Sequence, residues 1–229
     1  MPGGERLDDL CRCIDRPRPG PLSRAMGFYR DQIIPWLIHL SMRQPRLSPY
    51  RSRVVSAASG RVLEIGIGSG LNLPFYGNKV SELIGLDPSA KLLDMIRRAG
   101  GWRSAPLALI EGTAEAIPLE GRSVDTVVTT WTMCTIPEVR RALQEMCRVL
   151  RPGGCLIFVE HGRAPEPRVR WWQDRLDPAW TRFAGGCHLN RAIAELIESA
   201  GFRIERLETG YLRGPRPMTF MYEGSAQPR

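Results

Sequence analysis

The sequence predicts one α/β domain whose mostly parallel β-sheet is covered by helices on both faces. Short apolar runs of strand length alternate with segments whose apolar residues recur at helical spacing. A glycine-rich turn directly follows the first of these runs, at the carboxyl edge where open α/β sheets bind ligands. The chain of 229 residues, with 43% apolar and 24% charged residues, is typical of a single globular core.

The apolar runs locate the expected strands. Because they show no polar alternation, we expect them to be buried on both faces, as in a parallel sheet. These runs are residues 62–65, 83–86, 107–110, 124–129 and 155–159. Residues 202–207 and 218–223 predict two final strands, and the Gly/Pro loop between them is too short for a crossover helix. These two strands are therefore expected to pair antiparallel.

Helices are expected between the strands. Residues 138–150 carry one apolar stripe and are followed by Pro152-Gly153-Gly154, which cannot continue a helix. A second helix is expected over residues 89–99. A third is expected over residues 190–200, with Asn190 as its N-cap.

The chain divides into three parts. Residues 1–25 are rich in Arg, Pro and Gly and predict a flexible arm. Residues 26–57 contain apolar residues at helical spacing and predict a helical segment that could act as a lid. Residues 58–229 hold the alternating strands and helices and are expected to form the catalytic domain.

Charge and cysteine usage bound the partners and the compartment. The net charge is +8, yet no block of five or six like charges occurs, so we expect solvated faces and no nucleic-acid partner. The six cysteines form no CxxC pair, which favours reduced thiols, with Cys134 and Cys187 interpreted as small buried hydrophobes. No signal-like start and no run of eighteen apolar residues is present, so a cytoplasmic location is expected.

The strongest local motif is the glycine loop after the first strand. Gly66, Gly68 and Gly70 have the spacing Gly-x-Gly-x-Gly, which permits a tight turn and a close approach of the backbone to a ligand. Leu71 stands where a dinucleotide fingerprint has its third glycine, which argues against an NAD-linked oxidoreductase. No lysine followed by Ser or Thr comes after the loop, so it is not a phosphate-binding P-loop.

Two carboxylates accompany this loop. Asp87 ends the next strand, where a carboxylate can accept hydrogen bonds from both ribose hydroxyls of an adenosine. The alternative is an N-cap of the following helix, a role that Ser89 could equally fill. Glu64 lies within an apolar strand, so it needs a partner: the ammonium group of an amino-acid-like ligand or backbone donors of the loop.

An ordered series of motifs resembles the class I methyltransferases. The series comprises Glu64 with the glycine loop, Asp87-Pro88, residues 111–119, residues 124–125 and residues 148–154. The resemblance implies a Rossmann-like seven-stranded sheet with an antiparallel last strand, and S-adenosyl-L-methionine across the carboxyl edges of the first four strands. It further implies cofactor contacts from Asn72, Pro88, Thr113, Ala114 and Thr130, with Thr113 and Ala114 at the adenine.

The acceptor side is expected after the fourth and fifth strands. Four stretches look similar to the thiol S-methyltransferases and to bacterial relatives labelled as phospholipid or quinone-precursor methyltransferases: residues 128–136, Glu160-His161, residues 176–180 and residues 186–191. His161 is the candidate base or thiolate-steering group, with Glu160 beside it; the alternative is a histidine that orients a strand end. Trp131 is expected either to wall the methyl-transfer pocket or to fill the core.

These observations predict a methyltransferase for a small-molecule acceptor, in first place a small thiol or sulfide. A phospholipid (ethanolamine) or quinone-precursor acceptor is the alternative, and a module that binds S-adenosylmethionine or nucleic acid without catalysis is a further one. The aromatic residues Trp171, Trp172, Trp180 and Phe183 predict either a hydrophobic acceptor cavity or an exposed patch for peripheral membrane contact. A monomer or small homo-oligomer is expected.

Overall fold

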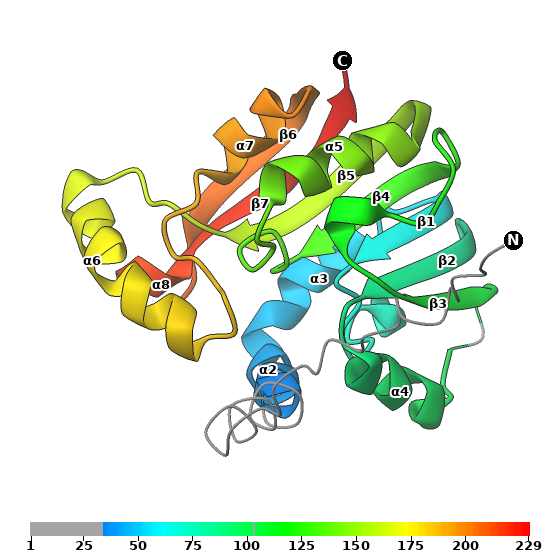
Figure 1. Ribbon diagram of the computed structural model, residues 1–229, viewed down its shortest axis with the longest axis horizontal. Coiled ribbons are helices and arrows are strands. Elements are labelled where there is room, and N and C mark those ends of the chain that lie inside the picture. Colours follow the sequence, from blue (N-terminus) through cyan, green and yellow to red (C-terminus); the bar gives the residue numbers. More distant parts are fainter. Residues whose placement is uncertain (1–33, 103) are drawn as a thin grey trace, which may run out of the picture.

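A computed structural model describes residues 34–102 and 104–229, and within them a seven-stranded sheet has the order β3-β2-β1-β4-β5-β7-β6 (Figure 1). The strands β1 to β5 pair parallel, and β7 pairs antiparallel with both β5 and β6. The predicted Rossmann-like sheet is therefore confirmed. Its strands are β1 (Gly60–Ile65), β2 (Val80–Asp87), β3 (Leu107–Glu111), β4 (Val124–Thr130), β5 (Leu150–His161), β6 (Phe202–Tyr211) and β7 (Phe220–Pro228).

Helices cover both faces of the sheet, and Figure 1 shows α5 and α7 together on the nearer face. The α-helices are α2 (Ile34–Met42), α3 (Ser48–Val55), α4 (Ala90–Ala99), α5 (Val139–Val149), α6 (Pro167–Phe183), α7 (Ile193–Ser199) and α8 (Arg216–Thr219). Short 3-10 turns are η3 (Pro45–Leu47), η4 (Leu73–Phe75) and η5 (Ala114–Ala116). No helix in the described ranges is both long enough and apolar enough to cross a bilayer.

Packing on both faces of the sheet explains why the strands have continuous apolar sequences. Leu63 of β1 faces the core cluster under α5 and α7, whereas its neighbour Val62 faces the cluster under α3. Helix α5 forms because its apolar residues recur at i, i+3, i+4 and i+7, and each buried side chain of this size contributes about 1.5–3 kcal/mol of hydrophobic stabilisation. The buried stripe of α5 consists of Val139, Ala142, Leu143, Met146 and Val149.

Some expected boundaries differ from the observed ones. Helix α7 begins at Ile193, so the expectation that Asn190 caps it is wrong. The Asn190 amide instead donates to Asp174 Oδ1 at 2.9 Å, and the Arg191 carbonyl accepts from the Arg163 N–H, which keeps this segment extended. The final strands β6 and β7 reach further than predicted, to residues 211 and 228. The predicted flexible arm, residues 1–25, lies outside the described residues, as does part of the 26–57 segment.

Candidate active site

The glycine loop, residues 66–70, directly follows β1, and all three of its glycines have positive φ. These angles are +67° at Gly66, +58° at Gly68 and +78° at Gly70. A Cβ atom on Gly66 would lie 2.4 Å from Thr132 Oγ1, and one on Gly70 would lie 2.8 Å from a Leu73 methyl group. A Cβ atom on Gly68 would meet nothing closer than the Gly66 carbonyl oxygen at 3.9 Å. The outer glycines thus permit close packing, and Gly68 faces open space.

Asp87, at the end of β2, holds the glycine loop in place. Its side chain is buried, with Oδ2 accepting from the Gly68 N–H at 2.9 Å and Oδ1 from the Ser89 N–H at 2.8 Å. Ser89 caps α4, accepting from the Leu92 N–H, so the capping role falls to Ser89. Burial raises the pKa of Asp87, although the two hydrogen bonds act to lower it. Each carboxylate oxygen retains capacity for a further hydrogen bond, as a ribose would require.

Glu64 lies under the loop in a buried polar network. Its Oε1 accepts from Asn72 Nδ2 at 2.7 Å, and its Oε2 accepts from the Tyr76 hydroxyl at 2.8 Å. Asn72 also donates to Thr130 Oγ1 at 2.9 Å. Only 1% of Glu64 is exposed, and this burial raises its pKa to about 7. The partners of Glu64 within the protein are therefore side chains of η4 and its flanks; backbone donors of the loop do not supply them.

Arg51 connects the N-terminal helices to this network. Buried on α3, it donates to Asn72 Oδ1 and, at 3.2 Å, to the Met42 carbonyl oxygen. Earlier in the same N-terminal segment, His39 Nδ1 of α2 lies 2.5 Å from Ser69 Oγ in the glycine loop. Asn72 and Thr130 stay predicted cofactor contacts, although the contacts that the structure gives Asn72 go to Glu64, Thr130 and Arg51.

Trp131 follows β4 in a left-handed backbone conformation, with φ of +51°. This conformation is uncommon for a residue with a large side chain and persists where the surrounding structure imposes it. The Trp131 N–H donates to the Val159 carbonyl oxygen at 2.8 Å, and the ring is partly exposed. Trp131 therefore lies at the sheet edge between the cofactor side and the acceptor side, and the expectation that it walls the pocket fits this position.

The predicted adenine contacts lie beside Asp87. Thr113 is exposed and Ala114 is buried in η5, directly after β3. The Gly112 N–H donates to the Asp87 carbonyl oxygen at 3.2 Å, which brings this turn next to the end of β2. Pro88 is exposed at the same edge. The fold thus brings the predicted cofactor residues to one edge of the sheet.

Glu160 and His161 end β5 but have different environments. Glu160 is fully buried, and its Oε1 accepts from the Thr132 N–H at 3.0 Å. Its Oε2 has no hydrogen-bond partner among the described residues, and burial raises its pKa to about 7. His161 is only partly buried, and its Nε2 lies 2.9 Å from Cys187 Sγ. The two side chains therefore do not act on one another through a direct hydrogen bond.

Cys187 forms the centre of the polar contacts on the acceptor side. Its Sγ lies 3.7 Å from Cys134 Sγ, and hydrogen bonds from Cys134 and His161 lower its pKa to about 4. Burial lowers the pKa of His161, but the contact with Cys187 outweighs this effect and raises it overall. Cys134 is buried as expected. The interpretation of Cys187 as a buried hydrophobe is wrong, because it is a partly exposed thiol in contact with an imidazole.

Two buried polar residues of α6 hold the loop that carries Cys187. Gln173 accepts from the Ala164 N–H and donates to the carbonyl oxygens of Gly162 and Leu189, each at 2.9 Å. Asp177 accepts from the Leu189 N–H at 2.6 Å and lies 2.9 Å from His188 Nδ1. Neither residue was predicted as part of the site, although Asp177 lies in the stretch 176–180 that marks the acceptor side. The sequence feature that could have identified them is their spacing: two polar residues four positions apart lie on one face of a helix that is otherwise rich in Trp and Arg.

The aromatic residues of α6 do not line a cavity together. Trp171, Trp172 and Phe183 are 51%, 47% and 73% exposed, so the expected acceptor cavity is wrong and the exposed patch is the observed arrangement. Trp180 differs from them, because its indole Nε1 is buried.

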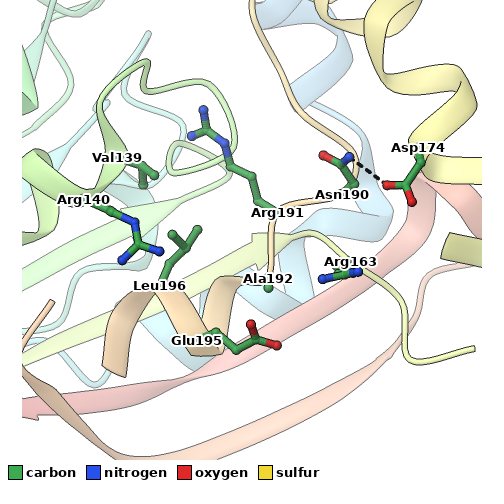
Figure 2. A pocket seen from close by; sticks show the side chains of 9 residues that line it. All are labelled: Val139, Arg140, Arg163, Asp174, Asn190, Arg191, Ala192, Glu195 and Leu196. Atoms are coloured by element: carbon green, nitrogen blue, oxygen red, sulfur yellow. Dashed lines mark hydrogen bonds between the residues drawn. The ribbon is translucent and has the colours of Figure 1, made fainter. Parts of the chain in front are cut away.

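A pocket of about 360 Å³ lies between α5, α6 and α7 (Figure 2). Its lining consists of Val139, Arg140, Arg163, Asp174, Asn190, Arg191, Ala192, Glu195 and Leu196. None of the residues predicted as cofactor contacts or catalytic groups contributes to it, although Asn190 and Arg191 end the stretch predicted on the acceptor side. Arg191 donates from this pocket to the carbonyl oxygens of Met133 and Ile136. The pocket thus borders the loop after β4 from the side away from the glycine loop.

The glycine loop and its carboxylates fit S-adenosyl-L-methionine. The open space above Gly68 gives the ligand access to the backbone, and Asp87 is placed for the ribose. The carboxylate of Glu64 at the base of the loop would complement the ammonium group of the methionine part. These three residues would therefore hold the cofactor.

Comparisons with known proteins identify the family of this chain. A family model for a methyltransferase domain matches residues 63–158. The chain is 33% identical over 180 residues to human thiol S-methyltransferase TMT1B, covering 74% of this chain and 70% of the relative. It is 36% identical over 109 residues to a phosphatidylethanolamine N-methyltransferase of Cereibacter sphaeroides, covering 47% and 53%. The chain spans between 62% and 70% of the lengths of the human, rat and mouse thiol S-methyltransferases that it matches.

A solved structure shares the fold. A SAM-dependent methyltransferase from Thermotoga maritima superposes with a TM-score of 0.58 at 20% identity, covering 91% of this chain and 96% of that one. Together, the fold, the geometry of the glycine loop and the sequence relatives show that this chain belongs to the class I methyltransferases, enzymes whose cofactor is S-adenosyl-L-methionine.

Proposed function

We propose that this enzyme methylates the sulfur of a small, fairly apolar thiol. The observation that carries the proposal is that His161 Nε2 lies 2.9 Å from a thiol, Cys187 Sγ. Hydrogen bonds from Cys134 and from His161 lower the pKa of this thiol to about 4. An acceptor thiol brought to the same edge would meet the same donors and would be ionised by them. The similarity to thiol S-methyltransferases supports the proposal.

For this reaction the protein has to position the cofactor and the acceptor and to favour ionisation of the acceptor thiol. S-adenosyl-L-methionine supplies an electrophilic methyl group on a sulfonium ion, whose charge disperses during the transfer. Gly68, Asp87 and the Glu64 network orient the cofactor at the edge of the sheet. Trp131, whose partly exposed ring directly follows β4, would shield the acceptor side from water. A free thiol has a pKa of about 8.5, so an environment that favours the thiolate raises the fraction that can react at neutral pH.

The test is methyl transfer from labelled S-adenosyl-L-methionine to a panel of small thiols, ethanolamine lipids and phenols. We expect turnover of thiols by the wild type and loss of turnover in Asp87→Ala, which removes the acceptor of the Gly68 N–H. An enzyme that ignores every thiol but methylates another class would overturn the proposal. RNA binding with a steep salt dependence and no methyl transfer would favour the non-catalytic alternative instead.

A lipid acceptor is the second candidate, favoured by the exposed Trp171, Trp172 and Phe183 of α6. Exposed aromatic residues of this kind suit the interfacial region of a membrane. The relative from Cereibacter sphaeroides bears the name of a phosphatidylethanolamine N-methyltransferase. Co-sedimentation with vesicles of phosphatidylethanolamine and an anionic lipid, compared with Trp171→Ser/Trp172→Ser, separates the candidates. Equal recovery of both proteins in the supernatant would count against the lipid.

A further inference from the structure

Three side chains with metal-binding atoms converge on the acceptor side of the sheet. Cys134 lies in the loop after β4, His161 at the end of β5, and Cys187 in the loop after α6. One ligand atom from each lies within 4.8 Å of the other two, and both cysteines are free thiols. Three segments that are far apart in sequence thus bring two sulfurs and an imidazole nitrogen to one point.

We propose that Cys134, His161 and Cys187 bind Zn²⁺ and leave its fourth position open to the sulfur of the acceptor. The second part of this inference rests on the proposed function, and the first part does not. Two thiolates and one imidazole form one of the ligand sets of catalytic zinc, which keeps a position for water or substrate.

The observed distances are close to those that the metal needs. Tetrahedral zinc with Zn–S of about 2.3 Å and Zn–N of about 2.0–2.1 Å separates two sulfurs by about 3.8 Å and a sulfur from a nitrogen by about 3.5 Å. The sulfurs of Cys134 and Cys187 are 3.7 Å apart, well beyond a disulfide bond. His161 Nε2 and Cys187 Sγ, at 2.9 Å, have to separate by about 0.6 Å, which a small rotation of either side chain provides.

Charge balance favours a divalent cation at this point. Two thiolates would carry two negative charges in a largely buried region, in which Cys134 is enclosed. A zinc ion supplies two positive charges, so the metal and its three ligands together become neutral, as a buried cluster requires.

Residues around the cluster hold the ligands in place, as is typical of metal sites. The His188 N–H donates to the Cys134 carbonyl oxygen at 2.9 Å, which joins the two cysteine loops. Asp177 and Gln173 fix the second of these loops onto α6. The buried indole N–H of Trp180, which has no oxygen acceptor among the described residues, stabilises the Cys187 thiolate.

The open position gives zinc a direct role in the transfer. An acceptor thiol that binds there releases its S–H proton to solvent and remains a nucleophile. Its sulfur forms the new S–C bond as the C–S bond of the sulfonium breaks, giving a thioether and S-adenosylhomocysteine. A neutral thioether is a weaker ligand than a thiolate, which favours its release. The step needs no oxidant or reductant.

The test is Co²⁺ titration of the metal-free, reduced protein, followed by visible absorption. We expect the intense ligand-field and sulfur-to-cobalt bands of a tetrahedral site at one equivalent, bleached by Zn²⁺ and shifted by the addition of a small thiol. Cys187→Ser and Cys134→Ser should lose these bands, whereas Cys147→Ser on α5, outside the cluster, should keep them. Calorimetric binding of S-adenosyl-L-methionine to each variant shows that it is folded.

The outcomes separate the two proposals. Wild type without tetrahedral bands, or Cys187→Ser with the bands of the wild type, would overturn the zinc site. Thiol turnover that survives chelation in such a protein would leave the proposed function intact. Tetrahedral bands that no thiol shifts would overturn the open acceptor position. Tetrahedral bands in an enzyme that methylates only other acceptors would overturn the proposed function and, with it, the thiol position, but would leave the zinc site.

Discussion

The guanidinium carbon of Arg51 lies 4.8 Å from the centre of the Trp131 indole ring. The same side chain donates to Asn72, which in turn donates to Glu64. A single cation of α3 thus contacts both the buried network of the cofactor side and the strained residue after β4. Stacking of a desolvated arginine on tryptophan contributes about 2 kcal/mol, and its hydrogen bonds add to this.

Replacing Arg51 by Ala should therefore weaken both stability and cofactor binding. The change leaves Asn72 Oδ1 and the Met42 carbonyl oxygen without this donor, and we expect a loss of about 2–4 kcal/mol in the free energy of unfolding. Urea denaturation and calorimetry with S-adenosyl-L-methionine measure the two effects. The exposed Arg98→Ala on α4 is the matched control, and equal behaviour of both variants would contradict this role of Arg51.

The affinity for the cofactor should fall as the pH decreases through 7. Glu64 has a pKa of about 7, so at pH 6 most molecules carry it protonated and without the charge that attracts the ammonium group. Between pH 7.5 and pH 6 we expect a five- to tenfold loss of affinity, about one pKa unit of interaction. Calorimetry at both values measures it. Glu64→Gln should bind S-adenosyl-L-methionine weakly at both pH values. If its affinity instead changes with pH as that of the wild type does, the titrating group is not Glu64.

The same carboxylate should affect the stability of the ligand-free protein in the opposite direction. Its pKa in the folded state, about 7, lies above the ordinary glutamate value of 4.5, so folding takes up a proton between these two pH values. The contribution of Glu64 to the free energy of unfolding therefore declines as the pH rises from about 4.5 to 7. Chemical denaturation across this window should show a flatter profile for Glu64→Gln than for the wild type. Identical slopes would show that Glu64 is charged throughout.

The backbone at Trp131 allows a comparison of two substitutions that both remove the ring. With φ at +51°, glycine fits this position without the steric cost that alanine meets. We expect Trp131→Gly to be about 1 kcal/mol more stable than Trp131→Ala, the reverse of the usual order in regular structure. Urea denaturation measures the difference. An alanine variant that is equally or more stable would show that the loop relaxes on removal of the ring.

Gln173 should be important for stability although it is far from the glycine loop. Its amide contacts three segments: the turn with Gly162 and Ala164, the loop with Leu189, and the segment with Pro217. Gln173→Leu keeps the volume but leaves buried backbone groups unpaired, so we expect a loss of about 2–4 kcal/mol and weaker thiol turnover. The neighbouring Trp172→Ala, on the exposed face, is the control and should change the melting temperature little. A stable, fully active Gln173→Leu would remove Gln173 from this role.

The sequence was sufficient to predict the sheet, because buried strands and amphipathic helices have distinct periods and α5 shows this clearly. It also showed that Glu64 needs a partner. It did not identify Tyr76 and Arg51 as parts of the network, since η4 and α3 reach it only through tertiary packing. The acceptor side was harder still: Cys134, His161 and Cys187 are separated by at least 26 residues, and their spacing follows no local metal motif.

The position of β7 between β5 and β6 has a consequence for the order of assembly. Strands β1 to β4 join through successive crossovers, so the half of the sheet that holds the cofactor grows from neighbouring segments of chain. Strand β6 has no partner in the sheet other than β7, which follows it in sequence. The sheet beside His161 is therefore complete only when β7, the last strand in the sequence, has paired. We expect the acceptor half to be the last part to fold and the first to open.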